Sequence, residues 1–453
     1  MKRLWPICLL AAVLLLGGCG GDGPGAAGDA ARAAKVLTIA SPHWEGVREE
    51  FTRGFREWYE AKHGLEVKVE WLDLGGTSSI LKYIKSEFTR SPEGIGIDMM
   101  YGGGIDPFIE LARLGYTETW VAPDELLEQI PETVSGMPCY DPGYQWYGAA
   151  LSGFGIVYNK PVLEMSGLPE PREWGDLCEP KALSWVASAD PRGSGSVHMI
   201  YEIMLQAYGW DKGWRVVTIM SANVRSFFSG SADVPNSVAS GDTAYGIAID
   251  SYALAQQAKV GADKIGYILP QGLTVINPDA ICMLKGAPER ELAEEFLYYV
   301  LSADGQKLWM LAKGDPEGPQ NYDIRRMSIR KDLYSQYADR IVVPMNPHSF
   351  RSEMEQDAGL ASKRWGVVND LLGALCIDTH DDLVEAWKAV IKAGMPDAAV
   401  DELCRMPVTA DEALEVAGFW DTDQAKRAKM VADWSTFARE KYRKAAAIAG
   451  RAE

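Results

Sequence analysis

The spacing of hydrophobic residues predicts alternating strands and helices at the start of the folded chain. Residues 36–40, 67–71 and 97–101 are short runs rich in β-branched and aromatic residues. Between the first two, apolar side chains over residues 47–59 recur mostly at i+3 and i+4, which makes one apolar helix face. Strands that alternate with helices at this spacing indicate βαβ units and a mostly parallel sheet.

The same alternation continues to about residue 320, and mainly helices follow. The predicted strands are residues 155–158, 185–187, 224–228 and 245–249, and the predicted helices are residues 194–208, 251–259, 288–301, 361–374, 383–393, 410–417 and 425–446. The fold class is therefore α/β, with an added helical segment at the C-terminus.

The N-terminus has the pattern of a bacterial export signal. Lys2 and Arg3 precede an apolar run over residues 4–16, which is too short for a bilayer that needs about 20 apolar residues. The sequence Leu-Gly-Gly-Cys that ends at Cys19 resembles a lipobox, so we expect a signal peptide over 1–18 and lipidation of Cys19 with several acyl chains, palmitate among them. The alternative is an ordinary secretory signal that contains a cysteine. Residues 19–34 are rich in Gly and Ala and predict a flexible tether.

The formal net charge of −18 argues against a nucleic-acid partner, which would need basic patches. Seven cysteines are present, of which Cys8 leaves with the signal and Cys19 is the lipid site. Two interpretations remain for the other five: two disulfides and one free thiol, with Cys376–Cys404 as the first pairing to consider, or five buried thiols. These five are Cys139, Cys178, Cys282, Cys376 and Cys404.

Polar residues follow nearly every predicted strand. A small-ligand site needs a few polar groups in a cleft, and in α/β sheets that cleft lies at the carboxyl ends of the strands. The candidate ligand-binding residues are His43, Trp44, Thr77, Ser78, Gly103, Gly104, Ser152, Ser194, Ser196, Asp250, Tyr252 and Asp279. Each also has a structural interpretation, as a helix cap, a turn former or a core residue.

Two of these loops favour an anion. The loops at 77–79 and 194–196 each enter a predicted helix, whose N-terminus offers unpaired N–H groups and a partial positive charge. Enzyme signatures such as G-x-S-x-G, H-E-x-x-H or a P-loop lysine are absent from the sequence, and its five histidines show no metal-ligand spacing. We therefore expect a binding protein, with no catalytic residues, no cofactor and no metal site.

Several segments together resemble one family. Residues 153–161, 171–177, 190–196, 241–250 and 305–309 are similar, in this order, to motifs of the family 1 extracellular solute-binding proteins of ABC importers. The similarity covers most of the first two-thirds of the chain. It is greatest to the group of iron(III), phosphonate and sugar-phosphate binders.

The resemblance implies a two-lobed periplasmic-binding-protein fold of type II, with two crossover hinges and the extra C-terminal segment. The lobes would be 35–152 with 278–320, and 153–277, while 321–453 would pack mainly on the first lobe. The protein would be a monomer, lipid-anchored in the periplasm or at the cell surface, that closes on a small-molecule solute and delivers it to an ABC permease in the cytoplasmic membrane.

The sequence departs from the iron-binding members. Those have adjacent tyrosines where this chain has only Tyr252, and the pair Tyr298–Tyr299 lies in a predicted helix. The expected solute is therefore a small organic anion such as a phosphonate or sugar phosphate, with ferric ion or a polyamine as alternatives. Two other functions stay open: a secreted lipoprotein enzyme acting on glycans or phosphoesters, and a lipoprotein that senses a ligand.

Overall fold

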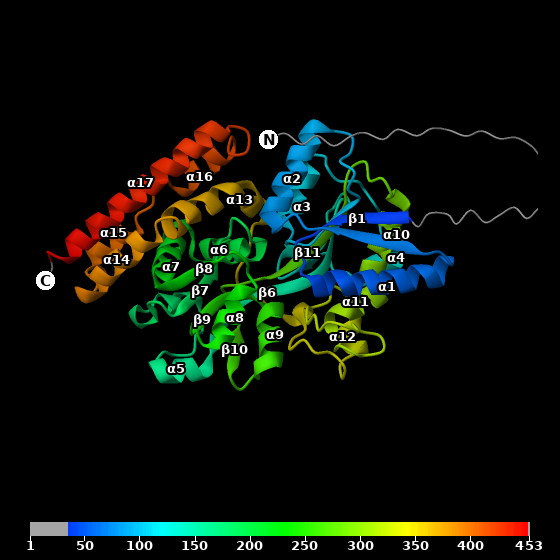
Figure 1. Ribbon diagram of the computed structural model, residues 1–453, viewed down its shortest axis with the longest axis horizontal. Helices are drawn as coiled ribbons and strands as arrows, with labels where there is room; N and C mark the ends of the chain where they lie inside the picture. Colours follow the sequence, from blue (N-terminus) through cyan, green and yellow to red (C-terminus); the bar gives the residue numbers. More distant parts are fainter. Residues whose placement is uncertain (1–34, 452–453) are drawn as a thin grey trace, which may run out of the picture. The chain divides into compact units, whose positions relative to one another are not determined.

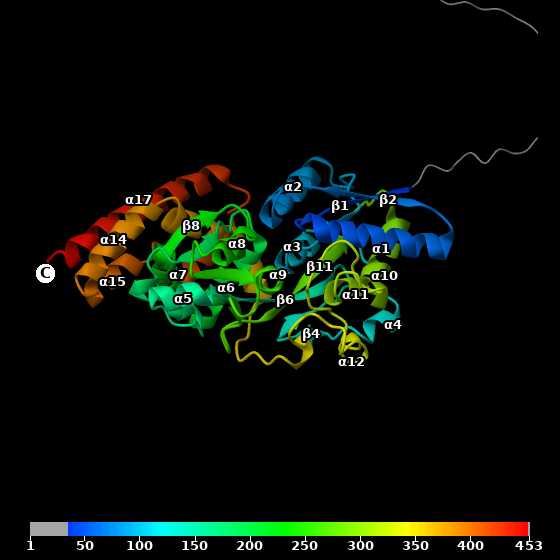
Figure 2. The same cartoon turned by 60° about the horizontal axis from the view of Figure 1, so that its bottom comes forward.

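A nine-stranded mixed sheet runs through residues 35–451, the part of the chain that the computed structural model describes. The strand order is β2-β1-β3-β11-β6-β9-β7-β8, and β10 pairs with β6 (Figures 1 and 2). The predicted signal peptide, Cys19 and tether lie outside the described residues.

The first lobe is built on β1 (Lys35–Ala40), which pairs in parallel with β2 (Val67–Leu72) and β3 (Met99–Tyr101). These are the three strands that the sequence predicted. β11 (Ile276–Met283) adds to β3 in the antiparallel sense. The lobe also contains α1 (Glu45–His63), α2 (Thr77–Arg90), α3 (Asp106–Arg113), α4 (Asp124–Leu127), α10 (Arg290–Leu301), α11 (Ala303–Met310), α12 (Leu333–Gln336) and the hairpin of β4 (Thr133–Val134) and β5 (Met137–Pro138).

One long strand joins the two lobes. All thirteen residues of β6 (Tyr147–Asn159) are buried. Its first part, 147–153, pairs with β11, and its second part, 154–158, pairs with β9 (Tyr245–Ile249). The chain therefore crosses between lobes at Gly153, where the sequence placed the crossover, and it returns through the segment between β10 (Ile265–Ile268) and β11.

In the second lobe, β7 (Val186–Ala189) lies between β8 (Val224–Phe228) and β9 and is parallel to both. The sequence predicted β8 and β9 with the bounds that the structure has. It missed α7, although Trp210, Trp214 and Val217 recur at helical spacing. The helices of this lobe are α5 (Lys160–Ser166), α6 (Gly195–Tyr208), α7 (Trp210–Asn223), α8 (Asp233–Ser240) and α9 (Asp250–Val260).

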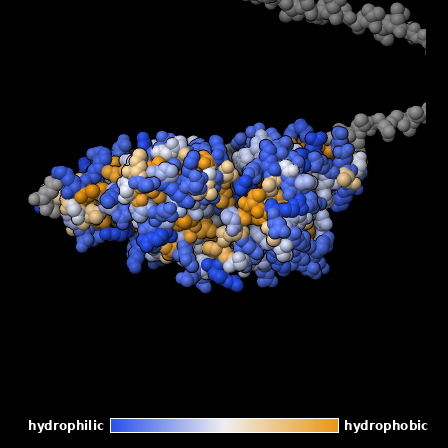
Figure 3. Space-filling view, turned by 90° about the horizontal axis from the view of Figure 1, so that it is seen from below, coloured by the Kyte–Doolittle hydropathy of each residue, from blue (hydrophilic) through white to orange (hydrophobic). Residues whose placement is uncertain are grey.

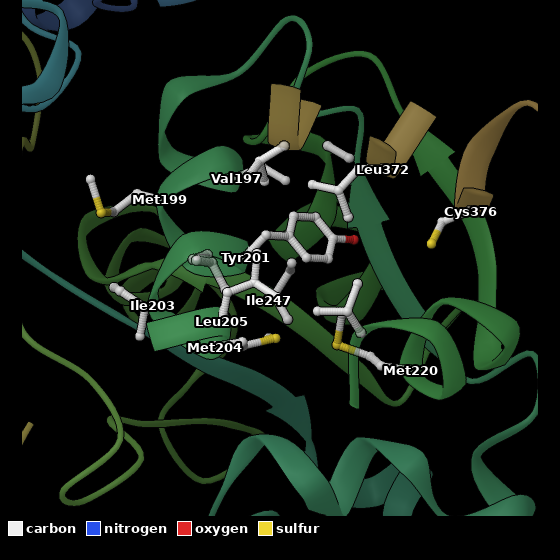
Figure 4. Close-up of a cluster of buried hydrophobic side chains, with 14 of the residues drawn as sticks. Val197, Met199, Tyr201, Ile203, Met204, Leu205, Met220, Ile247, Leu372 and Cys376 are labelled. Atoms are coloured by element: carbon white, nitrogen blue, oxygen red, sulfur yellow. The ribbon is translucent and has the colours of Figure 1, made fainter. Parts of the chain in front are cut away.

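From residue 358 on, the C-terminal segment packs mainly on the second lobe, contrary to the prediction for residues 321–453, whereas residues 324–343 of that segment pack in the core of the first lobe. It contains α13 (Ala358–Leu372), α14 (His380–Lys392), α15 (Asp397–Cys404), α16 (Ala410–Ala417) and α17 (Gln424–Ala449). α14 and α15 contact α7, and α13 contacts both α6 and α3. In Figure 4, Leu372 and Cys376 lie beside the apolar side chains of α6 and help to shield them from water.

Buried ion pairs and polar contacts also hold α13 in place. Arg364 of α13 donates to Glu202 of α6 at 2.6 Å, and both side chains are buried. On the side of the first lobe, Trp365 Nε1 donates to Ser78 Oγ at 3.2 Å. α13 is therefore attached to helices of both lobes. The other predicted domain boundaries stay predictions, because residues 35–453 cluster as one compact unit.

Asp106, next to this contact region, should make the stability of the protein depend on pH. It is buried at the start of α3, and neither carboxyl oxygen has a hydrogen-bond partner within residues 35–451. Burial, and then the charge of Glu202, raise its pKa to about 8. In the unfolded chain this carboxyl group has a pKa of about 3.9, so between pH 4 and pH 8 the native state holds a proton that the unfolded state has released. The contribution of Asp106 to stability is therefore complete below pH 4 and is lost as the pH rises to 8.

We expect Asp106→Asn to remove this pH dependence. Between pH 4 and pH 8, the free energy of unfolding should fall by about 2–4 kcal/mol more in the wild type than in the variant. Urea unfolding at both pH values measures it. Parallel pH profiles of the two proteins would contradict the assignment.

All five cysteines of the described region are free thiols. The suggested Cys376–Cys404 disulfide is therefore wrong, and the interpretation as unpaired thiols holds. Burial raises the pKa of the Cys376 and Cys404 thiols to about 11.

The surface seen in Figure 3 is largely hydrophilic. Hydrophilic residues cover most of the face in Figure 3, with smaller hydrophobic areas between them. Among residues 35–451, no helix has both the length and the apolar character that crossing a membrane requires.

Candidate functional site

A cavity of about 380 Å³ lies where loops of the two lobes meet. Loops of the first lobe that follow β1, β2 and β3 line one side, and loops of the second lobe that follow β7, β8 and β9 line the other. Its polar and charged lining residues are His43, Arg48, Asp73, Thr77, Ser152, Ser194, Ser196, Ser229, Ser231, Ser251, Tyr252, Asn277, Asp279 and Arg326.

The N-termini of two helices, α2 and α6, face each other at this cavity. A Cβ atom on Gly76, which precedes α2, would lie 1.6 Å from the carbonyl oxygen of Gly193. A Cβ on Gly195, the first residue of α6, would lie 2.8 Å from Thr77 Oγ1. Ser194 caps α6 by accepting from Val197 N at 3.4 Å. The two serine-rich turns therefore point toward one another, and the lobes are closed at this point.

A buried polar network forms the base of the cavity in the first lobe. Asp279 Oδ2 accepts from Arg326 at 2.5 Å and lies 2.8 Å from His43 Nε2. Arg326 also donates to Ser152 Oγ at 2.6 Å. The network joins β1, β6 and β11 to the segment that follows α11.

Backbone groups complete the environment of Asp279. Its Oδ1 accepts from the N–H groups of Gly103 and Gly104, at 2.6 and 2.9 Å. Both glycines have positive φ, 113° and 81°, a conformation that side chains disfavour, which explains the run of glycines after β3. Although burial opposes the charge of Asp279, Arg326 and His43 hold its pKa well below the usual range.

Two polar atoms on the cavity wall have no partner among residues 35–451. They are Nε of Arg326, a donor, and Oδ1 of Asn277, an acceptor. Buried polar atoms are normally satisfied, so these two residues of the cavity lining keep unused hydrogen-bonding capacity. Burial lowers the pKa of His43 and so favours the neutral ring, although Asp279 acts in the opposite direction.

Ten of the twelve candidate residues line the cavity: His43, Trp44, Thr77, Gly103, Gly104, Ser152, Ser194, Ser196, Tyr252 and Asp279. Their role in binding stays a prediction. Ser78 lies outside the cavity lining and accepts from Trp365. Asp250 is also outside; it accepts from Gly153 N at 2.8 Å and Ser251 N at 2.7 Å, so it fixes the crossover strand to α9. Both side chains accept hydrogen bonds from donors of the protein itself, which directs them away from the cavity.

The sequence argument missed Arg326 and the loop 229–231. Arg326 follows the last predicted strand and helix of the lobes by some twenty residues, and no local pattern separates it from neighbouring Arg325. Arg192, in the family-like segment 190–196, is outside the cavity lining and pairs with Asp190 at 2.7 Å and Asp378 at 2.9 Å.

The arrangement offers few ligands for a transition metal. Among residues 35–451, no group of three or more His, Cys, Asp or Glu side chains is placed to hold an ion. Tyr252 is the single tyrosine of the cavity lining. Tyr299, by contrast, packs against Phe55 and Trp58 in the core.

A family model described as "Bacterial extracellular solute-binding protein" matches residues 104–326. Over these residues the chain is similar to the bacterial extracellular solute-binding proteins. The match includes Gly104, the crossover strand β6, α6 and its N-terminus, β11 and Arg326, so the family segment provides a large part of the cavity. The resemblance expected from the sequence motifs is confirmed.

Among curated proteins, this protein is similar to the phosphoglycerate transport regulatory protein PgtC of Salmonella typhimurium, 28% identical over 191 residues. That match covers 41% of this chain and 47% of PgtC. The chain thus spans about half the length of the first curated relatives it matches.

Among solved structures, the periplasmic binding protein AfuA of Actinobacillus pleuropneumoniae, with fructose-6-phosphate bound, is 22% identical with a TM-score of 0.54. The match covers 68% of this chain and 99% of AfuA. The apo ferric ion-binding protein A of Pasteurella haemolytica is 16% identical with a TM-score of 0.57, covering 75% of this chain and 97% of that one. These likenesses show the two-lobed periplasmic-binding-protein fold, to which this chain adds the C-terminal helices.

Proposed function

We propose that this protein captures a small organic anion, such as a phosphonate or sugar phosphate, and delivers it to an ABC importer. The observation that carries the proposal is the pair of helix N-termini that face one cavity, each with hydroxyl side chains beside it. Unpaired N–H groups and the helix dipole favour negative charge at such a place. Two of them from opposite lobes would bind the anion only when the lobes close.

The charges of the cavity support an anion over a cation. Its two carboxylates, Asp73 and Asp279, each have an arginine beside them, Arg48 at 3.5 Å and Arg326 at 2.5 Å. No carboxylate of the lining is therefore left over for a polyamine, whereas the helix N-termini add positive potential. A cavity of about 380 Å³ is near the small end of ligand pockets, typically about 300–1,000 Å³, and suits a solute of a few carbons with one anionic group.

The names of similar proteins point in the same direction. One of the relatives is named for phosphoglycerate transport, and one of the similar structures holds fructose-6-phosphate. We therefore propose 3-phosphoglycerate and fructose 6-phosphate as the first solutes to test. Thermal shift provides the screen, because a ligand at about 100 times its Kd adds about 2.7 kcal/mol of stability.

The double variant Ser194→Ala with Ser196→Ala tests the site. Loss of two hydrogen bonds to a charged ligand, at about 1.5 kcal/mol each, should weaken binding roughly 100-fold in calorimetry. Ser166→Ala with Ser335→Ala, two helix serines outside the cavity lining, serves as the control and should bind normally. Unchanged affinity in the first variant would remove this turn from the site, and turnover of the solute would replace transport with an enzyme function.

A second candidate function is ligand sensing, favoured because PgtC is named as a transport regulatory protein. Both functions need the same closed, solute-bound state. They differ in the membrane partner, so co-purification of the solute-loaded protein with an ABC permease supports transport, and co-purification with a sensor kinase supports sensing.

We also propose that the protein is a monomer held at the membrane by lipid on Cys19, after removal of residues 1–18. The charged, apolar and small-residue parts of the N-terminus in their normal order support this. The mass of the mature N-terminal peptide tests it, because acyl chains on Cys19 add a mass that a secreted form lacks.

A further inference from the structure

A second cavity, of about 560 Å³, lies between the first lobe and the C-terminal segment. Its walls come from α2 and α3 on one side and from α13, α16 and the start of α17 on the other, and Figure 1 shows α13 beside α2 and α3. Its volume falls within the usual range of ligand pockets. Arg192 and Ser78, which the solute cavity leaves out, belong to its lining.

The lining collects more positive than negative charge, although the chain as a whole carries −18. Each carboxylate of this cavity lining already forms an ion pair with a lysine or an arginine. Glu110 accepts from Lys85 at 2.6 Å, and Asp370 accepts from Arg427 at 2.6 Å. Asp421 also contacts Lys85, at 2.5 Å.

Three further cations of the lining, Lys82 of α2, Arg113 of α3 and Lys363 of α13, have no carboxylate partner within residues 35–451. They come from three helices and are exposed at the same cavity. In an acidic chain, most cations find a carboxylate, so three unpaired ones around one cavity concentrate positive potential there.

Between these charged groups, part of the cavity wall is apolar. Trp365 stacks on His198 with ring centroids 3.6 Å apart, and Trp420 stacks on Trp434 at 5.1 Å. Leu81 and Val367 add aliphatic surface, and both are buried. Apolar walls with a few charged groups at the opening are typical of sites for amphipathic small molecules.

We propose that this second cavity binds an organic anion with an apolar body, such as an aryl or short acyl carboxylate, sulfonate or phosphate. Trp365, Trp420 and Leu81 would contact the body, and Lys82, Arg113 and Lys363 would attract the anionic group. The site is separate from the solute cavity, and its assignment does not rest on the transport proposal. Because its walls belong to the first lobe and to the segment packed on the second, a bound anion would stabilise the closed arrangement of the lobes.

The probe is 2-naphthalenesulfonate, with 2-naphthol as its neutral counterpart, measured by calorimetry on the mature protein. A ligand of this size, at about 0.3 kcal/mol per heavy atom, should bind with a Kd of about 1 mM or tighter. Its affinity should fall as salt is added, because exposed charges are screened. 2-Naphthol should bind about tenfold more weakly; equal affinity would overturn the proposal, since the cations would then have no role.

The test variant is Lys82→Glu with Lys363→Glu, and Lys82→Gln with Lys363→Gln is its milder form. Reversal should weaken the sulfonate about tenfold or more and leave 2-naphthol unchanged. Lys212→Glu with Lys259→Glu, exposed lysines outside both cavity linings, changes the net charge equally and should bind normally. If this control loses as much affinity, or if Ser194→Ala with Ser196→Ala abolishes binding, the probe is not in the second cavity and the proposal fails.

Discussion

Asp279→Ala is expected to lower the free energy of unfolding by about 3–5 kcal/mol, because it leaves the guanidinium of Arg326 buried without its counter-charge. Both side chains are about 8% exposed, and Asp279 also accepts from two backbone N–H groups. Urea unfolding at neutral pH measures the loss. The same variant should bind no anionic solute tightly, since His43 and Arg326 lose their common anchor.

Two controls separate a broken buried pair from a general loss of charge. Glu385→Ala breaks the exposed Lys388–Glu385 pair, with half or more of each side chain exposed, and should cost less than about 1 kcal/mol. Asp279→Leu with Arg326→Met removes both charges and should recover most of the stability, though not the binding. A loss for Asp279→Ala no larger than that for Glu385→Ala would show that the pair is solvated.

Gly76→Ala should prevent the lobes from closing without unfolding them. Its new methyl group would lie 1.6 Å from the carbonyl oxygen of Gly193, and neither partner is a flexible side chain that can move aside. Overpacking costs about 1–3 kcal/mol, and here that cost falls on the closed form alone. Solute affinity should therefore drop by between about fivefold and 150-fold, while the thermal stability of the ligand-free protein changes little.

The matched control is Gly175→Ala. The atom nearest to its new methyl group would be in the side chain of Glu173, at 3.7 Å, which is an ordinary van der Waals contact. Its solute affinity should equal that of the wild type. Small-angle scattering of the two variants with solute present gives an independent measure, with Gly76→Ala staying extended. Normal affinity and normal compaction of Gly76→Ala would mean that the lobes bind solute without this close contact.

The candidate site could be located in large part from local sequence patterns. Ser194, Thr77 and the glycines after β3 were found because polar residues directly follow predicted strands, and parallel strands bring their carboxyl ends to one edge. Arg326 could not be found in this way. It reaches the cavity from a segment without a regular element, and only its contact with Asp279, 47 residues earlier, distinguishes it.

The amino-acid sequence by itself determined most strands and helices of both lobes, though not α7 or β11, because hydrophobic periodicity is a local property that each element carries in its own residues. It also determined the crossover at Gly153 and the family. Only the tertiary structure decided which lobe the C-terminal helices cover, which polar residues turn inward as Ser78 and Asp250 do, and that the five cysteines stay unpaired. These outcomes depend on which apolar faces and buried donors meet across long sequence separations, and no local pattern records that.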